Sequence, residues 1–138
     1  MIKNKTFIIA EIGINHDGFL SKSKKLIDLA KKGGADAVKF QYFLPEDLYL
    51  KNDKNFSAAK KFSLNGSQIK FLRDYSKKIK IKFLCTPFGI DKAVFLKKIN
   101  VDGFKIASMD CLNSNLIKKC LSFKKPVFVS TGMLNQRE

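Results

Sequence analysis

Short runs rich in Ile, Val and Phe alternate along the chain with longer segments in which apolar residues return every three or four positions. The first pattern is typical of strands and the second of amphipathic helices. The chain is therefore predicted to switch regularly between the two. We expect five strands, at residues 6–13, 36–41, 81–88, 102–108 and 126–133, and four helices, at 21–34, 67–78, 91–99 and 113–123.

Capping residues and apolar faces refine the predicted helices. Ser21 and Asn113 are expected to cap the first and last helices, and Gly33-Gly34 should end the first one. Each of the first two helices is expected to bury one apolar face. The residues of these faces are Leu26, Ile27, Leu29 and Ala30 in the first helix and Ile69, Phe71, Leu72 and Tyr75 in the second.

Residues 42–65 follow neither period. They contain Pro45 and scattered lysines, and we predict a long irregular loop there. Loops of this length in compact domains are usually functional or disordered.

The regular order of strands and helices, with mostly short connections, predicts a parallel α/β sheet with right-handed crossovers. An open doubly wound sheet and part of a (β/α)8 TIM barrel both fit this order. No G-x-G-x-x-G fingerprint follows the first strand, which disfavours a dinucleotide-binding sheet. Polar residues stand at the carboxyl ends of all five strands, where barrels build their active sites. They are Glu11, Lys39, Gln41, Thr86, Lys105, Ser108, Ser130 and Thr131.

Length limits how much of a barrel the chain can form. A complete barrel takes about 250 residues, whereas this chain has 138. We therefore predict that residues 1–138 form the N-terminal portion of a barrel, about five strands. Apolar residues on the inner faces of these strands, among them Ile8, Val38, Phe83 and Val127 or their neighbours, are expected to be exposed without a facing half-barrel.

The net charge of +15 raises the question of nucleic-acid binding, but the basic residues argue against it. Lysines number 25 and arginines only two, Arg73 and Arg137, and the lysines are scattered over predicted helices rather than gathered in one stripe. Nucleic-acid readers favour arginine, whose planar guanidinium binds bidentately. We predict a solvated basic surface, with neither nucleic acid nor membrane as partner.

Cysteine usage and hydropathy point to the cytoplasm. Cys85, Cys111 and Cys120 are odd in number and lack metal-binding spacing, so reduced, buried thiols are expected. No apolar run approaches the roughly 18 residues of a membrane span, and the apolar stretch near the N-terminus is too short for a secretory signal.

Lys39 and Lys105 are expected to point into one mouth, because side chains alternate along a strand and their neighbours are apolar. Two such ammonium groups repel each other unless an anion lies between them. Phosphate or carboxylate fits, assisted by the hydroxyls of Thr86 and Ser108. Glu11 adds a carboxylate suited to general acid–base work or to a metal-bound water. A phosphorylated, acidic small molecule is the predicted ligand.

Five blocks in order carry a resemblance to a known family. They are AEIGINHDG (10–18), KFQ (39–41), CTPF (85–88), FKIAS (104–108) and PVFVSTGM (126–133). The chain resembles the N-terminal half of the sialic acid synthase family over residues 6–134. The resemblance implies a TIM barrel followed by an antifreeze-like domain, and a reaction that joins phosphoenolpyruvate to an N-acetylmannosamine-type sugar. The products would be a nine-carbon 2-keto acid and phosphate.

The resemblance also implies roles for individual residues. Glu11 would be the catalytic acid at the end of strand one. Phosphoenolpyruvate would be bound by Lys39, Thr86, Lys105 and Ser108, and the sugar by Gln41 and Asp110. Asp110 stands where the family usually has a glutamate, so the preferred acceptor stays open among the sialic, legionaminic and pseudaminic branches.

A divalent metal, Mn²⁺ or Mg²⁺, is implied for the complete enzyme, held by two histidines of later strands. His16 is the only histidine here, and we expect it to orient its loop by hydrogen bonding. The complete enzyme is expected to be a cytoplasmic homodimer. We expect the 138-residue chain alone to be inactive, and a catalytically inactive fragment is the alternative reading.

Overall fold

The computed structural model describes residues 6–135, which form a parallel sheet of five strands in the order β1-β2-β3-β4-β5. Each strand pairs with the next one along the chain, as successive right-handed βαβ units require. The parallel α/β class predicted from the sequence is confirmed. The strands are β1 Ile9–Gly13, β2 Ala37–Tyr42, β3 Lys82–Pro87, β4 Gly103–Ile106 and β5 Val127–Val129.

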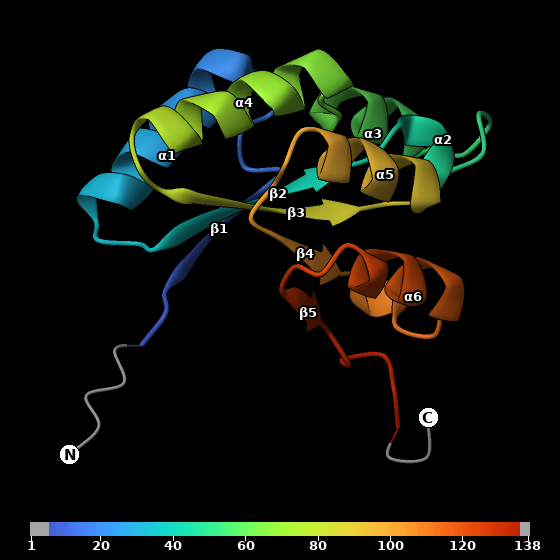
Figure 1. Cartoon of the computed structure of the whole chain (residues 1–138). Coiled ribbons are helices and arrows are strands. Elements are labelled where there is room, and N and C mark those ends of the chain that lie inside the picture. The colour runs from blue at the N-terminus through green and yellow to red at the C-terminus, as the bar shows by residue number, and fades with distance from the viewer. Residues whose placement is uncertain (1–5, 136–138) are drawn as a thin grey trace.

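The helices lie on one face of this sheet (Figure 1), where their apolar sides meet the strands. All four predicted helices form, each within two residues of its expected bounds. They are α1 Leu20–Lys32, α4 Gly66–Lys78, α5 Ile90–Lys98 and α6 Ser114–Ser122.

Side chains that alternate along the strands separate the core from the opposite face of the sheet. Phe40, Phe83 and Phe104 are fully buried beneath the helices, and the rings of Phe40 and Phe83 stack with centroids 5.2 Å apart. Lys39 lies between Val38 and Phe40 in sequence, so its side chain points to the other face. The core therefore fixes which polar residues face the predicted site.

The same alternation corrects the predicted inner face. Val38 and Phe83 are fully buried, because they point toward the helices rather than into a barrel interior. Val127 is half-buried and packs against the same core. Ile8 is 53% exposed, as expected, and Phe128 of β5 is 40% exposed.

The start of α1 differs from the prediction. Its N-cap is Phe19, with no side-chain cap, and Ser21 lies inside the first turn. The backbone N–H of Phe19 donates to the carbonyl of His16 in the turn before the helix, and the N-cap lies two residues earlier than predicted. Leu29 of α1 and Phe71 of α4, both predicted to be buried, are about half exposed. The predicted Asn113 cap is confirmed, since its side chain accepts from the N–H of Leu116 at 3.1 Å.

Residues 42–65 were predicted to be irregular, but they hold two short helices, α2 Pro45–Leu48 and α3 Phe56–Phe62. Pro45 begins α2 at the position where its missing N–H costs nothing. Asp47 then forms an ion pair of 2.6 Å with Lys92 of α5, whose side chain is only 7% exposed. This pair ties the segment to the body of the sheet.

The cysteines are free thiols, with Cys85 and Cys120 buried and Cys111 half-buried. Burial raises the pKa of Cys120 to about 11, so this thiol is protonated and behaves as a small apolar side chain. Within residues 6–135, none of the helices has the length and apolar character that crossing a lipid bilayer demands.

Candidate active site

Lys39 is the centre of the predicted site. Its side chain is 9% exposed, and its Nζ lies 2.6 Å from Oε2 of Glu11 and 3.4 Å from the hydroxyl of Thr86. Register explains the first contact, because Glu11 and Lys39 are paired across β1 and β2. Three of the residues predicted to share a site therefore meet at the carboxyl end of the sheet.

Lys105 completes a pair of cations on the same face. Burial lowers the pKa of Lys105, and the positive charge of Lys39 lowers it further, while Glu11 acts in the opposite direction. Glu11, the one carboxylate that acts on Lys105, is already paired with Lys39, so this end of the sheet has a local excess of positive charge. Such an arrangement favours an anionic ligand.

Gly13 shapes the backbone beside Glu11. The register shifts between Glu11 and Gly13, and Gly13 has a φ of +53°, where a side chain is strained. A Cβ at this position would lie 3.0 Å from Oε1 of Glu11 and 3.8 Å from the amide nitrogen of Gln41. The glycine therefore leaves room for both polar groups beside the end of β1.

Ser108 and Asp110 lie in a 3-10 turn, η1 Ser108–Asp110, directly after β4. The Ser108 hydroxyl is 3.6 Å from the position that a Cβ on Gly132 would occupy, so it borders the segment after β5. Asp110 accepts a hydrogen bond from the Asn113 amide at 3.2 Å, beside the start of α6. Within residues 6–135, Asp110 forms no hydrogen bond or ion pair with Glu11, Lys39 or Gln41.

His16 is buried in the loop between β1 and α1 and is 1% exposed. Its Nδ1 accepts a hydrogen bond from the N–H of Gly18 at 3.0 Å, and its ring stacks on Phe40 at 6.0 Å between centroids. Burial lowers the pKa of His16, which keeps the ring neutral at pH 7. The expectation that His16 orients its loop by hydrogen bonding is confirmed.

The described residues do not fit the divalent metal that the resemblance implies. No group of three or more His, Cys, Asp or Glu side chains suited to a metal ion occurs in this part of the chain. Glu11 is held by Lys39, and Nδ1 of His16 is occupied by the Gly18 N–H. We therefore assign no residue here as a metal ligand.

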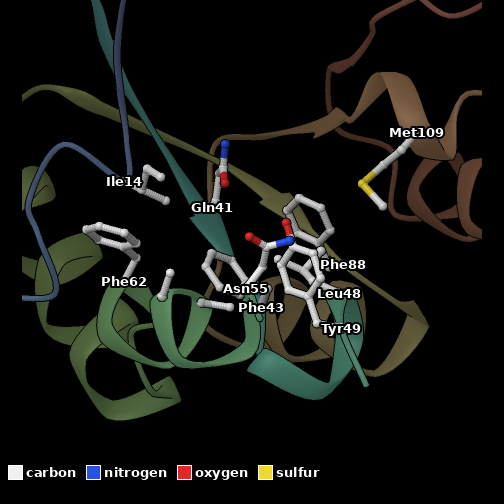
Figure 2. A pocket seen from close by; sticks show the side chains of 11 residues that line it. Ile14, Gln41, Phe43, Leu48, Tyr49, Asn55, Phe62, Phe88 and Met109 are labelled. Atoms are coloured by element: carbon white, nitrogen blue, oxygen red, sulfur yellow. The ribbon is translucent and has the colours of Figure 1, made fainter. Parts of the chain in front are cut away.

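An apolar cavity of about 430 Å³ adjoins the polar cluster and shares Gln41 with it. In Figure 2, Ile14 and Phe62 stand on one side of the cavity and Phe88 with Leu48 on the other. The cavity is walled mainly by α2, α3 and the segments that join them to the sheet. Its remaining lining residues are Phe43, Tyr49, Asn55, Ala58, Ala59 and Met109.

This cavity and the Lys92–Asp47 pair were not predicted from the sequence. The signals that could have pointed to them are the helix start at Pro45 and the spacing of apolar residues in FSAAKKF (56–62). Burial lowers the pKa of Lys92, but hydrogen bonds and charges from Asp47 and Asp91 outweigh burial and raise it overall. Lys92 is thus a charged side chain that holds one wall of the cavity.

The chain is similar to known proteins over most of its length, including the residues of the polar cluster. The profile of the NeuB family matches residues 26–138. The chain belongs to the NeuB family. The resemblance to sialic acid synthases noted in the sequence is thereby confirmed at the level of the family.

Two curated relatives of this NeuB-family chain show how similar it is to them. An uncharacterized protein of Methanocaldococcus jannaschii, MJ1065, is 42% identical over 93% of this chain and 38% of its own length. The N,N'-diacetyllegionaminic acid synthase of Campylobacter jejuni is 36% identical over 97% of this chain and 44% of its own. The chain thus spans about two fifths of the length of these relatives.

A solved structure supports the fold. The N-acetylneuraminic acid synthetase of Leptospira borgpetersenii, crystallised with citrate, superposes with a TM-score of 0.91 at 33% identity. The match covers 97% of this chain and 47% of that one. The five parallel strands correspond to part of a TIM barrel.

Proposed function

We propose that this chain carries the phosphoenolpyruvate-binding part of a sugar-acid synthase. The reaction would join phosphoenolpyruvate to an N-acetylmannosamine-type sugar and yield a nine-carbon 2-keto acid and phosphate. The observation that carries the proposal is the pair Lys39 and Lys105 on one face of the sheet, whose charges act on each other while the one carboxylate that acts on both, Glu11, is paired with Lys39.

Phosphoenolpyruvate bears a carboxylate and a phosphate, which match this excess of positive charge. Lys39 and Lys105 would each hold one of its anionic groups, and the hydroxyls of Thr86 and Ser108 would donate to their oxygens. Charge-assisted hydrogen bonds of this kind contribute about 1.5–3 kcal/mol each. Their direction and partial burial would fix the substrate in one orientation.

The chemistry follows from the enol phosphate. Its vinyl carbon forms a carbon–carbon bond to the aldehyde carbon of the open-chain sugar, whose oxygen takes up a proton. The phosphate-bearing carbon, left electron-poor, is attacked by water. The tetrahedral intermediate then collapses with cleavage of the carbon–oxygen bond, releasing phosphate and leaving the keto group. The two lysines would hold the negative charges throughout, an electrostatic role.

Glu11 is proposed to accept the proton of the attacking water. Its carboxylate is engaged with Lys39, and half of the side chain is exposed. A bound anion would compete for the Lys39 ammonium and so free a carboxylate oxygen beside the reacting carbons. Ligand binding would thereby prepare the general base.

The complete enzyme is proposed to be a cytoplasmic homodimer with a divalent cation, Mn²⁺ or Mg²⁺. Residues 1–138 would form part of its barrel, followed by further strands and an antifreeze-like domain. The described residues form no ligand set for the cation, so the steps above involve only this chain's own side chains.

The apolar cavity favours a second candidate acceptor. Gln41 would bind a polar group of the sugar, while Phe43, Phe62 and Phe88 offer apolar walls beside it. Acetyl methyl groups fit such walls, and a diacetylated amino sugar presents more of them than N-acetylmannosamine. A legionaminic- or pseudaminic-type acceptor is therefore the alternative substrate.

Calorimetric titration of the chain with phosphoenolpyruvate tests the main proposal. Lys39→Ala and Lys105→Ala should each weaken binding by about tenfold or more, whereas Lys118→Ala on the exposed side of α6 should not. Equal affinities for all four proteins would contradict the proposal.

A second titration tests which sugar is the acceptor. The chain, labelled with ¹³C-methyl methionine and saturated with phosphoenolpyruvate, is titrated with each sugar in turn. The Met109 methyl lines the cavity, and Met133 provides an internal control. A larger Met109 shift and tighter binding with the diacetylated sugar would support the alternative acceptor, and the reverse order would support N-acetylmannosamine.

A further inference from the structure

A second concave surface lies at the amino ends of the strands, opposite the site described above. It is a cavity of about 240 Å³, which we call the amino-end pocket. It lies between the end of α4, the start of β3 and the turn before β4. Its lining residues are Arg73, Lys77, Lys80, Ile81, Lys82, Asn100 and Asp102.

The amino-end pocket is strongly basic. Four of its seven lining residues are cations, and Asp102 is its one acid. The Asp102 carboxylate is already engaged, since Oδ2 accepts the backbone N–H of Phe83 at 2.8 Å. The positive charge of the pocket is therefore far from neutralised by its own residues.

Arg73 gives the pocket a specific donor. Its side chain is 14% exposed, and Nη1 lies 3.0 Å from Oδ1 of Asp74. Its Nε is fully buried and finds no hydrogen-bond partner among the described residues. A buried N–H without an acceptor is unfavourable, because the group has lost its hydrogen bond to water. Because Nε is buried, a ligand acceptor reaches it only through a shift of the Arg73 side chain, and that shift would satisfy the N–H.

Lys125 adds a further cation at the edge of the pocket. Its Nζ donates to Oδ1 of Asn100 at 2.6 Å, so it shares a neighbour with the lining residues. Burial lowers the pKa of Lys125, Asp102 raises it, and the positive charges of Lys97 and Arg73 lower it further. An added negative charge would relieve this repulsion.

We infer that the amino-end pocket binds a phosphate group, either free phosphate or the phosphate of a small metabolite, through Arg73, Lys77, Lys80 and Lys82. The guanidinium of Arg73 presents donors in a planar fork that suits phosphate oxygens, and the lysines supply charge around it. The inference goes beyond the proposed function, since none of these residues belongs to the Lys39 site. The small concave shape suits a compact anion rather than a nucleic-acid strand.

Arginine side-chain resonances provide a direct test. The chain has only two arginines, so the Arg73 Nε–H signal in a ¹H–¹⁵N spectrum can be assigned with Arg73→Lys. The titration uses inorganic phosphate, and separately glycerol phosphate, on a Lys105→Ala background that weakens the other anion site. Sodium chloride at matched ionic strength is the reference.

We expect a saturable shift of the Arg73 signal with phosphate and none with chloride. Lys77→Ala should weaken binding about tenfold, whereas Lys78→Ala, its exposed neighbour outside the pocket, should leave affinity unchanged. Tighter binding of glycerol phosphate would identify a phosphate ester as the ligand, and equal binding would identify free phosphate.

Three outcomes would overturn the inference. They are an Arg73 signal that phosphate does not move, a chloride shift of equal size, and equal losses in the Lys77 and Lys78 variants. The last two would reduce the pocket to general surface charge. Because Lys77 and Lys78 are exposed helix residues, both variants should fold.

Discussion

The ammonium group of Lys39 lies 2.6 Å from the carboxylate of Glu11, and the two side chains differ sharply in exposure, 9% against 54%. The lysine depends on this partner and on Thr86 for its buried charge, whereas the glutamate is half solvated. The pair is therefore asymmetric: Glu11 can leave at little cost once another anion replaces it. That asymmetry motivates the role proposed for Glu11 and makes it testable.

Glu11→Gln is expected to retain phosphoenolpyruvate binding or to tighten it, because the substrate no longer competes with a carboxylate for Lys39. Turnover in a complete enzyme should nevertheless fall by about 10²-fold or more, since the general base is lost. Calorimetry on the chain and phosphate release by the complete enzyme measure the two quantities. Weakened binding with normal turnover at saturation would instead assign Glu11 a positioning role.

Lys105→Met should raise stability and lower phosphoenolpyruvate affinity together. The lowered pKa of Lys105 means that its charged form is disfavoured in the fold, so the charge is unfavourable at neutral pH. After allowance for partial exposure, we expect a gain of about 0.5–1 kcal/mol in the free energy of unfolding. The gain should shrink as the pH rises toward the ordinary lysine pKa of 10.5. Urea denaturation measures the gain, with Lys118→Met as the control. A loss of stability in Lys105→Met would contradict the prediction.

Asp47→Asn should destabilise the chain and loosen the cavity wall. It leaves the Lys92 ammonium, 7% exposed, with only Asp91, whose side chain is 74% exposed. We expect a loss of about 1–3 kcal/mol, against less than 1 kcal/mol for the matched variant Asp91→Asn. Lys92→Met in the Asp47→Asn background should recover part of the loss, because no buried charge then lacks a partner. Equal losses in the two single variants would count against the assignment.

The fold was predictable because its signals are local and repeated. Each βαβ unit contains a β-rich apolar run and an amphipathic helix, and short connections leave little choice of topology. The errors arose where burial depends on contacts distant in sequence. Phe71 belongs to an apolar pattern yet is 47% exposed, whereas Lys92 appears polar and is buried through Asp47, 45 residues away.

The site was predictable to the extent that strand register determines it. Placing Lys39 and Thr86 at strand ends was sufficient to bring them together, and Glu11 is paired directly with Lys39. Asp110 follows the strand rather than ending it, and its carboxylate meets Asn113. The cavity was missed because α2 and α3 have too few residues to show a clear period.

His16 makes the stability of the chain depend on pH. Because burial holds its pKa below the ordinary value of 6.5, the unfolded chain binds the proton more readily than the folded one. The contribution of the neutral ring to the free energy of unfolding is fully present above pH 6.5 and is lost as the pH falls toward the lowered pKa. His16→Asn keeps an acceptor for the Gly18 N–H but does not titrate. Between about pH 7.5 and 5.5, the urea midpoint of the His16→Asn variant should therefore fall less than that of the parent chain. An equal fall of the two midpoints over this pH range would contradict the prediction.

The polypeptide of 138 residues, expressed by itself, should self-associate and form no keto acid. Within residues 6–135, β1 and β5 are the outer strands of the sheet, and each presents unpaired backbone groups on one side. Phe128 and Val129 of β5 are 40% and 46% exposed, so apolar surface accompanies that edge.

Val129→Lys places a charge on the edge and should shift the chain toward monomer in analytical ultracentrifugation. The matched variant Val94→Lys alters a residue of similar exposure, 45%, on helix α5. It should leave the proportion of monomer unchanged. The described residues also hold no cluster of metal ligands. Phosphoenolpyruvate and N-acetylmannosamine should therefore give no product with this chain, with or without manganese. A monodisperse monomer that releases phosphate from the two substrates would show both expectations to be wrong.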